Sequence, residues 1–331
     1  MSFTRVRMFC AALVFAVVAV PGYAWNESGH RIIAAAAAAQ MSPELQARVV
    51  SLLEAHPRYA DDLLAYQPRK LRDLSHPQWL MGQAAAWPDH ARSFDNAPRR
   101  KRDALVETYH RGNWHYINLP VYLTRADRRL RIKDPTTKPN LNDPRDVLSA
   151  LLAIGRDLRD PDISTQQKGL WLSWALHLIA DVHQPLHTSA VFSKKRWPRG
   201  DRGGNEVKIA GTEKNGRLDS LHYFWDSAIS NRRRPHEVAQ LVEVLDAQVL
   251  PEVASNELDP TLWIAEGHQL AQTSVYGPLS KQILASPVVN IDTEYTQQTH
   301  KAALQRAALA ARRTALWLEW ALFGEPLVGS E

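Results

Sequence analysis

Two histidine and aspartate pairs in the sequence share one spacing. His177 and Asp181 stand four residues apart in a strongly apolar stretch, and His222 and Asp226 repeat that spacing. Residues four apart project from one face of a helix, so each pair can direct an imidazole and a carboxylate at one point. One such pair is as often a hydrogen-bonded pair in a protein core, but two pairs favour a metal site.

Further imidazoles and a carboxylate accompany these pairs. His30, Asp89 and His115 stand among tryptophans or other apolar residues, where an enclosed polar group needs a partner or a metal ion. His187 follows Asp181 by six residues, after a proline that ends the helix. Imidazole and carboxylate without thiolate suit zinc in a hydrolytic role better than a structural zinc finger. These eight candidate ligands are too many for one tetrahedral ion and nearly enough for three.

The N-terminal residues predict a ninth ligand. Residues 1–24 carry two arginines, an apolar run over 8–20 and small residues at positions 22 and 24, a pattern typical of a secretory signal peptide cleaved before Trp25. The apolar run is short for a membrane anchor, which is the alternative. Cleavage would free the amine of Trp25, which can chelate a metal together with its own carbonyl. Export would then also complete the metal site.

Composition sets limits on the class of protein. The 331-residue chain has 40 Lys and Arg against 35 Asp and Glu, and 45% hydrophobic residues, which is ordinary for a globular protein. Removal of residues 1–24 leaves 38 basic and 35 acidic residues, too mild an excess to indicate a polyanionic partner by itself. The single cysteine, Cys10, leaves with the signal peptide. Stability outside the cell must therefore come from a large core, bound metal or both.

The elements that position these residues are expected to be helices. Apolar spacing is helical nearly throughout, which predicts an all-α, mostly helical fold. Because the candidate ligands come from residues 25 to 226, they tie most of the chain together, and one domain is expected over residues 25–331. Ser42 before Pro43 is suited to cap a helix. Strand-like alternation is scarce, apart from a small β-hairpin expected near 205–209. The expected helices cover about 30–40, 43–53, 58–73, 80–92, 143–158, 165–182, 218–230, 235–250, 259–275 and 292–323.

Seven short motifs occur in a fixed order along the chain, and each is weak alone. Together they resemble the zinc-dependent single-strand-specific nucleases of the S1/P1 type, which share their fold with bacterial zinc phospholipases C. The motifs are Trp25, Gly29-His30, Trp87-Pro88-Asp89, Trp114-His115-Tyr116-Ile117, His177-x₃-Asp181-x₅-His187, Gly203-Gly204-Asn205, and Leu221-His222-x₂-Trp225-Asp226.

The resemblance implies three zinc ions and assigns the ligands to them. His90 and His183 match no ligand position and are expected beside the ligands or at the surface. The implied groups are Asp89, His115 and His177 for the first ion, His187, His222 and Asp226 for the second, and the amine and carbonyl of Trp25 with His30 for the third, with Asp181 bridging the first and third.

The charge of such a centre favours an anionic substrate. Three zinc ions bring six positive charges, three aspartates remove three, and one bridging hydroxide still leaves +2. A phosphodiester fits this charge. By the resemblance, Asp89 also orients the attacking water and Arg92 neutralises charge in the transition state, unless Arg92 is only a solvated arginine. Tyr116 would stack on an unpaired base, unless it is a core aromatic, and Asn118 stands where fungal members have a base-contacting aspartate.

The expected function is therefore an exported, periplasmic or secreted, zinc endonuclease. It would cleave single-stranded DNA and RNA to 5′-phosphorylated products and act on 3′-nucleotides, without a membrane anchor or an obligate protein partner. One alternative is a phospholipase C acting on lipid head groups, and another is a non-catalytic periplasmic zinc-binding protein. The helix over 292–323 could lie on a membrane surface, although closure of the core is the favoured interpretation.

Overall fold

The computed structural model describes residues 25–65, 67, 71, 73–95, 97–213, 216–231 and 234–324. The signal peptide predicted over residues 1–24 lies outside the described residues. Among the helices that are described, none combines the length and apolar character needed to cross a bilayer.

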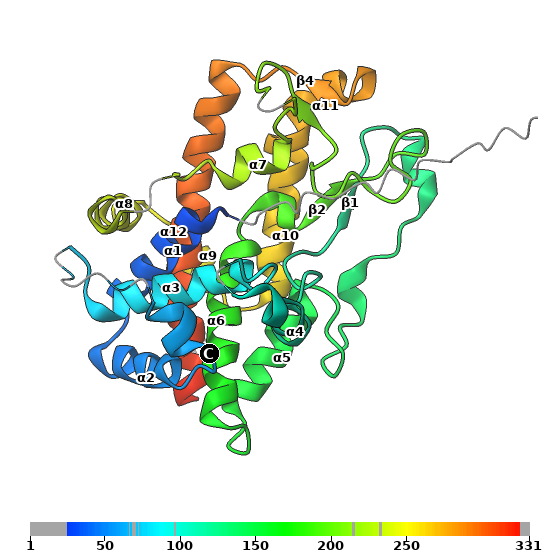
Figure 1. The fold of residues 1–331 in the computed structure, drawn as a ribbon. Coiled ribbons are helices and arrows are strands. Elements are labelled where there is room, and N and C mark those ends of the chain that lie inside the picture. Colours follow the sequence, from blue (N-terminus) through cyan, green and yellow to red (C-terminus); the bar gives the residue numbers. More distant parts are fainter. Residues whose placement is uncertain are drawn as a thin grey trace, which may run out of the picture.

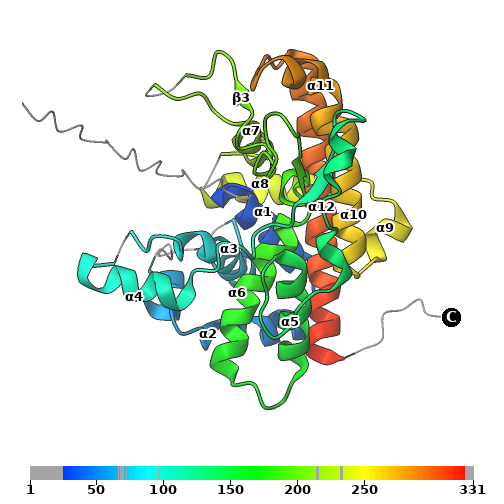
Figure 2. The ribbon, with the colours of Figure 1, turned by 90° about the vertical axis from the view of Figure 1, so that its right-hand side faces the viewer.

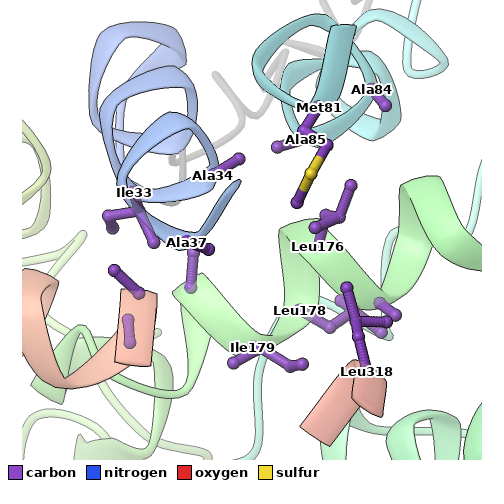
Figure 3. Packing of buried hydrophobic residues seen from close by; sticks show 14 of the residues in the cluster. Ile33, Ala34, Ala37, Met81, Ala84, Ala85, Leu176, Leu178, Ile179 and Leu318 are labelled. Atoms are coloured by element: carbon purple, nitrogen blue, oxygen red, sulfur yellow. The ribbon is translucent and has the colours of Figure 1, made fainter. Parts of the chain in front are cut away.

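Four helices form the centre of the fold. Helix α1 (Glu27–Ala39) packs against α3 (His76–His90), α6 (Thr165–Asp181) and α12 (Thr293–Phe323). Helix α12 runs along most of the height of the molecule in both views (Figures 1 and 2). Its Trp317 and Leu318 are buried, so this helix closes the core, as the sequence favoured. Figure 3 shows side chains of all four helices meeting, among them Ile33, Met81, Leu176 and Leu318.

Small residues let α1 and α3 approach closely. The alanines at positions 34–38 are all buried, and they bring little side-chain volume to the interface. Gly82 of α3 faces the backbone of Arg31, where an added Cβ would lie 3.4 Å from the carbonyl oxygen of Arg31. The alanine run therefore fixes a short distance between two helices that carry site residues.

Side-chain caps determine where several helices begin. Ser42 accepts a hydrogen bond from the backbone N–H of Leu45, which confirms the predicted start of α2 (Pro43–Glu54). Ser164 caps α6 and Asp292 caps α12 in the same manner. Each cap satisfies backbone donors that have no partner within the helix.

The remaining helices differ from expectation in extent. The helix expected over 58–73 is only a π-helical turn, η1 (Tyr59–Leu63). Helix α4 (Arg99–Tyr109) was not among the expected helices, and none of its side chains is fully buried. The other helices are α5 (Val147–Arg159), α7 (Leu221–Asp226), α8 (Pro235–Asp246), α9 (Glu252–Asn256), α10 (Pro260–Leu270), η5 (Ala271–Val275) and α11 (Tyr276–Ala285), with α4 at Arg99–Tyr109 and short 3₁₀ turns η2 (Asp127–Leu130), η3 (Pro135–Thr137) and η4 (Pro185–His187).

Strands are few and short in the described residues, so the mostly helical fold is confirmed. Strand β1 (Leu119–Val121) pairs in parallel with β2 (Ser189–Val191), and β3 (Lys208–Ile209) pairs in parallel with β4 (Val288–Val289). The prediction of a hairpin near 205–209 is wrong, because the strand that pairs with β3 is not its neighbour in the sequence. Lys208 makes one antiparallel bridge to Ser220, but β4, about 80 residues further along the chain, completes the strand pair.

A second, smaller hydrophobic cluster supports α7. It contains Trp225, Tyr276 and Ile283 and lies among α7, α11 and the short strands. Trp225 donates its indole N–H to the hydroxyl of Tyr295, which in turn donates to the carbonyl of Val275. These contacts hold the helix that carries His222 and Asp226.

Candidate metal centre

Eight predicted ligand side chains converge from six segments of the chain. They come from α1, α3, the segment before β1, α6, η4 and α7. Within each of three groups the possible ligand atoms lie within 4.8 Å of one another. The groups are His30, His177 and Asp181; Asp89, His115 and His177; and His187, His222 and Asp226.

The two helical pairs have the geometry that their spacing predicts. His177 Nε2 lies 3.2 Å from Asp181 Oδ2, and His222 Nε2 lies 3.5 Å from Asp226 Oδ2. His30 reaches the other oxygen of Asp181 at 3.4 Å and stacks on the ring of His177 with 3.8 Å between centroids. Asp181 thus has a histidine at each carboxylate oxygen, which is the arrangement that a bridging ligand requires.

Backbone carbonyls orient three of the imidazoles. In each case Nδ1 lies within hydrogen-bonding distance of a carbonyl oxygen, which leaves Nε2 available as a ligand atom. The three pairs are His177 with Ala85 at 2.8 Å, His187 with His115 at 2.5 Å, and His222 with Gly203 at 2.7 Å.

Unpartnered buried atoms test whether a metal fits these residues. A buried polar atom without a partner costs free energy, and such atoms are rare in folded proteins. Here they cluster at the three groups, and zinc accepts imidazole nitrogen and carboxylate oxygen as ligands. The residues therefore fit metal ions. The unpartnered atoms include both ring nitrogens of His30, Nε2 of His115 and His187, and one carboxylate oxygen each of Asp181 and Asp226.

Burial controls protonation in this centre. It lowers the pKa values of His30, His115 and His187, so these rings are neutral, which is the ligating form. Burial also raises the pKa of Asp181 to about 6. Burial alone would lower the pKa of His177, but the carboxylates of Asp181 and Asp89 outweigh it and raise that pKa. Bound cations would take the place of the protons that these groups share.

Trp25 lies beside the ligands, as the ninth ligand would have to. Its side chain is fully buried, and its indole N–H donates to the carbonyl of Ala180, next to Asp181. The following backbone N–H, from Asn26, donates to the carbonyl of Asp226. Gly29 packs on Trp25, since a Cβ there would lie 2.9 Å from Trp25 Cβ.

A cleft of about 330 Å³ opens above the ligands His115, His187 and His222. The predicted substrate residues Tyr116 and Asn118 line it, and Tyr116 is 43% exposed rather than a core aromatic. Arg92 lines it too, with Nη2 at 2.9 Å from Asp89 Oδ1, and it is only 11% exposed. The structure thus brings all the predicted site residues to one centre and its cleft.

Comparison with known proteins identifies the group to which this site belongs. The sequence profile described as S1/P1 nuclease matches residues 25–322. The chain belongs to the S1/P1 nuclease family. It is therefore a hydrolytic nuclease, and the resemblance drawn from the seven motifs is confirmed. A relative is "Endonuclease 4" of Arabidopsis thaliana, 23% identical over 310 residues that cover 89% of this chain and 83% of the plant protein.

Some residues of this S1/P1 site were not predicted as functional. Gln184 donates from its amide to Asp226 Oδ1 at 2.6 Å, and Gly203 supplies the carbonyl that faces His222. Gln184 lies within the motif His177-x₃-Asp181-x₅-His187 and Gly203 within Gly203-Gly204-Asn205, and these locations were the only sign of their role in the sequence. His110 and Arg202 also line the cleft, and no motif indicated them.

The two histidines left without a ligand role differ in position. His90 is exposed, and its Nε2 lies 3.4 Å from Oε1 of Glu27. His183 is fully buried, and its Nε2 accepts from Arg313 of α12, which also binds Glu266. This buried network joins the longest helix to the turn that follows Asp181.

Proposed function

We propose that this nuclease is a three-zinc enzyme that hydrolyses phosphodiester bonds of single-stranded DNA and RNA to 5′-phosphorylated products. It also removes phosphate from 3′-nucleotides. The signal peptide over residues 1–24 directs it to the periplasm or the outside of the cell, and processing before Trp25 completes the domain over 25–331.

The convergence of the ligand groups carries this proposal. Eight side chains drawn from residues 30 to 226 meet in three groups, and three of them, His115, His187 and His222, line one cleft. The unpartnered buried atoms of these side chains, and the neutral imidazoles of His30, His115 and His187, favour a metal site over a core hydrogen-bond network. Family membership independently supports a nuclease.

In this proposal Asp89 and Arg92 have separate roles in the reaction. Zinc, when bound by the nine ligands, supplies Lewis acidity and lowers the pKa of water. Asp89 accepts a hydrogen bond from the attacking water and thereby aims it at phosphorus. Arg92 lies beside Asp89 and donates to the phosphoryl oxygens as their negative charge grows. Because the Arg92 side chain is only 11% exposed, reduced screening by water strengthens this interaction.

The cleft supports a preference for unpaired strands. Its ligands are buried, so a duplex cannot bring its backbone to them without losing base pairs. An unpaired nucleotide can enter and place its base on the exposed ring of Tyr116, a contact worth about 1–3 kcal/mol. Asn118 also lines the cleft, and its amide would contact base edges.

The decisive experiment combines metal analysis with an activity assay. Zinc per chain would be measured by elemental analysis on protein processed at Trp25. Cleavage of single-stranded DNA would be assayed on the same sample with and without chelator. Three zinc ions and chelator-sensitive cleavage are expected. Three ions without cleavage would redirect the proposal to phospholipid head groups, and one ion or none would contradict it.

A further inference from the structure

Two loops that are distant in sequence meet beside the cleft. Strands β1 and β2 are parallel, so the segments that follow them, residues 122–133 and 192–202, leave the same edge of the strand pair (Figure 1). Backbone N–H groups connect the segments, because Phe192 donates to the carbonyl of Val121 and Lys194 donates to Asp127 Oδ1. We refer to residues 122–133 and 192–202 together as the two-loop basic surface.

This surface concentrates the positive charge of the protein. It contains ten basic and two acidic residues, out of 38 and 35 in residues 25–331. Outside it the acidic residues therefore outnumber the basic ones, 33 to 28. The small net charge of the whole chain conceals a strongly positive region and a negative remainder. Such a region attracts polyanions.

The basic side chains are exposed while the two acids are engaged internally. Asp127 and Asp201 are buried and accept hydrogen bonds from backbone or hydroxyl groups. Among the described residues, the one salt bridge formed by the exposed bases joins Arg202 to Glu206 at 3.5 Å, with both side chains about half exposed. Solvent-exposed pairs of this kind stabilise a protein only weakly, so a phosphate can displace Glu206 from Arg202. The exposed bases are Arg125, Arg128, Arg129, Arg131, Lys133, Lys194, Lys195, Arg199 and Arg202.

Arg202 makes the surface continuous with the cleft. It lines the cleft, and its backbone lies in the left-handed region at φ 59°, which is unfavourable for a residue with a side chain. The neighbours on both sides hold it there. Asp201 is bound by Val191 N–H and the Tyr276 hydroxyl, and Gly203 packs so closely on the Leu186 carbonyl that a Cβ would lie 2.4 Å from it.

We propose that the two-loop basic surface binds the phosphates of a single strand as it leaves the cleft past Arg202. The inference rests on the proposed function and adds a reason for the enzyme to favour polynucleotides over mononucleotides. A lipid membrane is the less favoured partner, because none of the exposed large apolar side chains of the described chain lies in either loop.

The test removes charge from both loops without touching the cleft. A triple variant with Arg128→Ala, Lys194→Ala and Lys195→Ala would be compared with wild type on a single-stranded 40-mer and on a dinucleotide. The KM for the 40-mer is expected to rise about tenfold. The slope of log affinity against log salt should fall by about 2, because each phosphate bound by a single-strand-binding protein contributes about 0.7 to that slope. The dinucleotide, which ends short of the loops, should show less than a twofold change.

A matched control removes the same charge elsewhere. The triple variant Arg48→Ala, Arg234→Ala and Lys301→Ala removes exposed bases from α2, from the residue before α8 and from α12, none of which lines the cleft or belongs to either loop, and it should behave as wild type. Equal 40-mer kinetics in both variants would overturn the inference, as would loss of binding to phosphatidylglycerol vesicles without a change on DNA.

The two proposals can fail separately. If wild type cleaves no nucleic acid, the proposed function fails. Fluorescence anisotropy of a labelled phosphorothioate 40-mer with the same three proteins still decides the inference. Weaker binding by the loop variant alone supports it, and equal binding by all three contradicts it.

Discussion

Arg92 and Tyr116 both line the cleft, but they differ in exposure and in the role that we propose for each. Arg92 is nearly buried and already paired with Asp89, so its guanidinium is held in place before substrate arrives. Tyr116 directly follows the ligand His115 and leaves its ring exposed. The first residue would act on the transition state and the second on the bound strand, so substitutions should affect different kinetic constants.

Replacement of Arg92 should reduce the rate of the chemical step. We expect Arg92→Ala to lower kcat about 10² to 10³-fold with little change in KM, because a donor to the developing charge is removed. Arg92→Lys keeps the charge and should retain part of the rate. Zinc content, measured in parallel, should stay constant. A loss of zinc would instead mean that Arg92 acts by positioning Asp89.

Replacement of Tyr116 should weaken binding of the strand. Tyr116→Ala is expected to raise KM for single-stranded DNA by about 5- to 150-fold, which corresponds to removal of one stacking interaction of roughly 1–3 kcal/mol. Tyr116→Phe preserves the ring and should resemble wild type. Steady-state kinetics on a short oligonucleotide measure both variants. An unchanged KM in Tyr116→Ala would exclude stacking on this ring.

At the level of elements, α6 is the helix on which the metal centre depends most. It carries His177 and Asp181, and its N-terminal half packs against α2. Gly169 makes that contact possible, since a Cβ there would lie 2.3 Å from the Leu52 carbonyl oxygen. The position of His177 and Asp181 is therefore fixed partly by a glycine near the other end of α6.

A methyl group at Gly169 should push α6 away from α2. We expect Gly169→Ala to lower the free energy of unfolding by about 1–3 kcal/mol, because the close backbone approach leaves no room for it. The neighbouring Lys168→Ala serves as a control and should change stability by less than about 0.5 kcal/mol. Thermal and urea unfolding of the zinc-loaded proteins would measure both. Equal stability of the two variants would show that the helices can separate without cost.

The loop that presents Arg202 should give the protein a pH-dependent stability. Burial raises the pKa of Asp201 to about 6, despite its hydrogen bonds from Val191 and Tyr276. A carboxyl with a raised pKa in the folded state stabilises the fold fully below about pH 4. That stabilisation is lost as pH rises through about 6.

Asp201→Asn should remove this dependence. Between pH 4 and pH 7 the variant should gain up to about 3 kcal/mol relative to wild type, since the amide keeps hydrogen-bonding capacity without a charge to bury. Urea unfolding at several pH values measures the difference. Asp201→Ala, which loses both bonds, should be less stable than Asp201→Asn throughout. A constant difference between wild type and Asp201→Asn across this pH range would contradict the assignment.

The sequence predicted those elements whose determinants are local. Ser42, Ser164 and Asp292 cap the helices that they precede, and the i, i+4 pairs on α6 and α7 follow from helical spacing. Helix α4 was missed because its apolar face is small: it has no fully buried residue, and only Leu105, Val106 and Tyr109 pack partly buried against the core. The partner of β3 could not be predicted, because β4 is about 80 residues away.

For the site, as for the fold, only the parts with local sequence signals could be predicted. The ligands could be recognised because each stands in a short motif, whereas the two-loop basic surface depends on the pairing of β1 with β2, which no motif encodes. The buried contact between His183 and Arg313 likewise joins residues 130 positions apart.

At the scale of the whole molecule, the N-terminus and the metal centre are coupled. Trp25 is fully buried beside Asp181, and the backbone of Asn26 binds that of Asp226. The proposed third zinc ion therefore depends on the chain beginning at residue 25.

One additional residue before Trp25 should weaken that ion's site. An added glycine converts the amine into an amide nitrogen, which does not coordinate in the same way, so zinc content should fall from three to two per chain. Elemental analysis after dialysis would detect the loss, with an equally long C-terminal extension as the control. Three zinc ions in the N-terminally extended protein would refute the role given to the amine.

The positions of the ligands along the sequence also affect how the protein would respond to cleavage by a protease. Residues 122–133 are rich in exposed arginine and lie between His115 and His177, so the ligands divide between the two pieces that a cut there would produce. Bound ions would hold the two pieces together, in the way that disulfides hold cleaved chains together in many secreted proteins. A chain without a cysteine after Cys10 could thus tolerate cleavage of its backbone for as long as its metal stays bound.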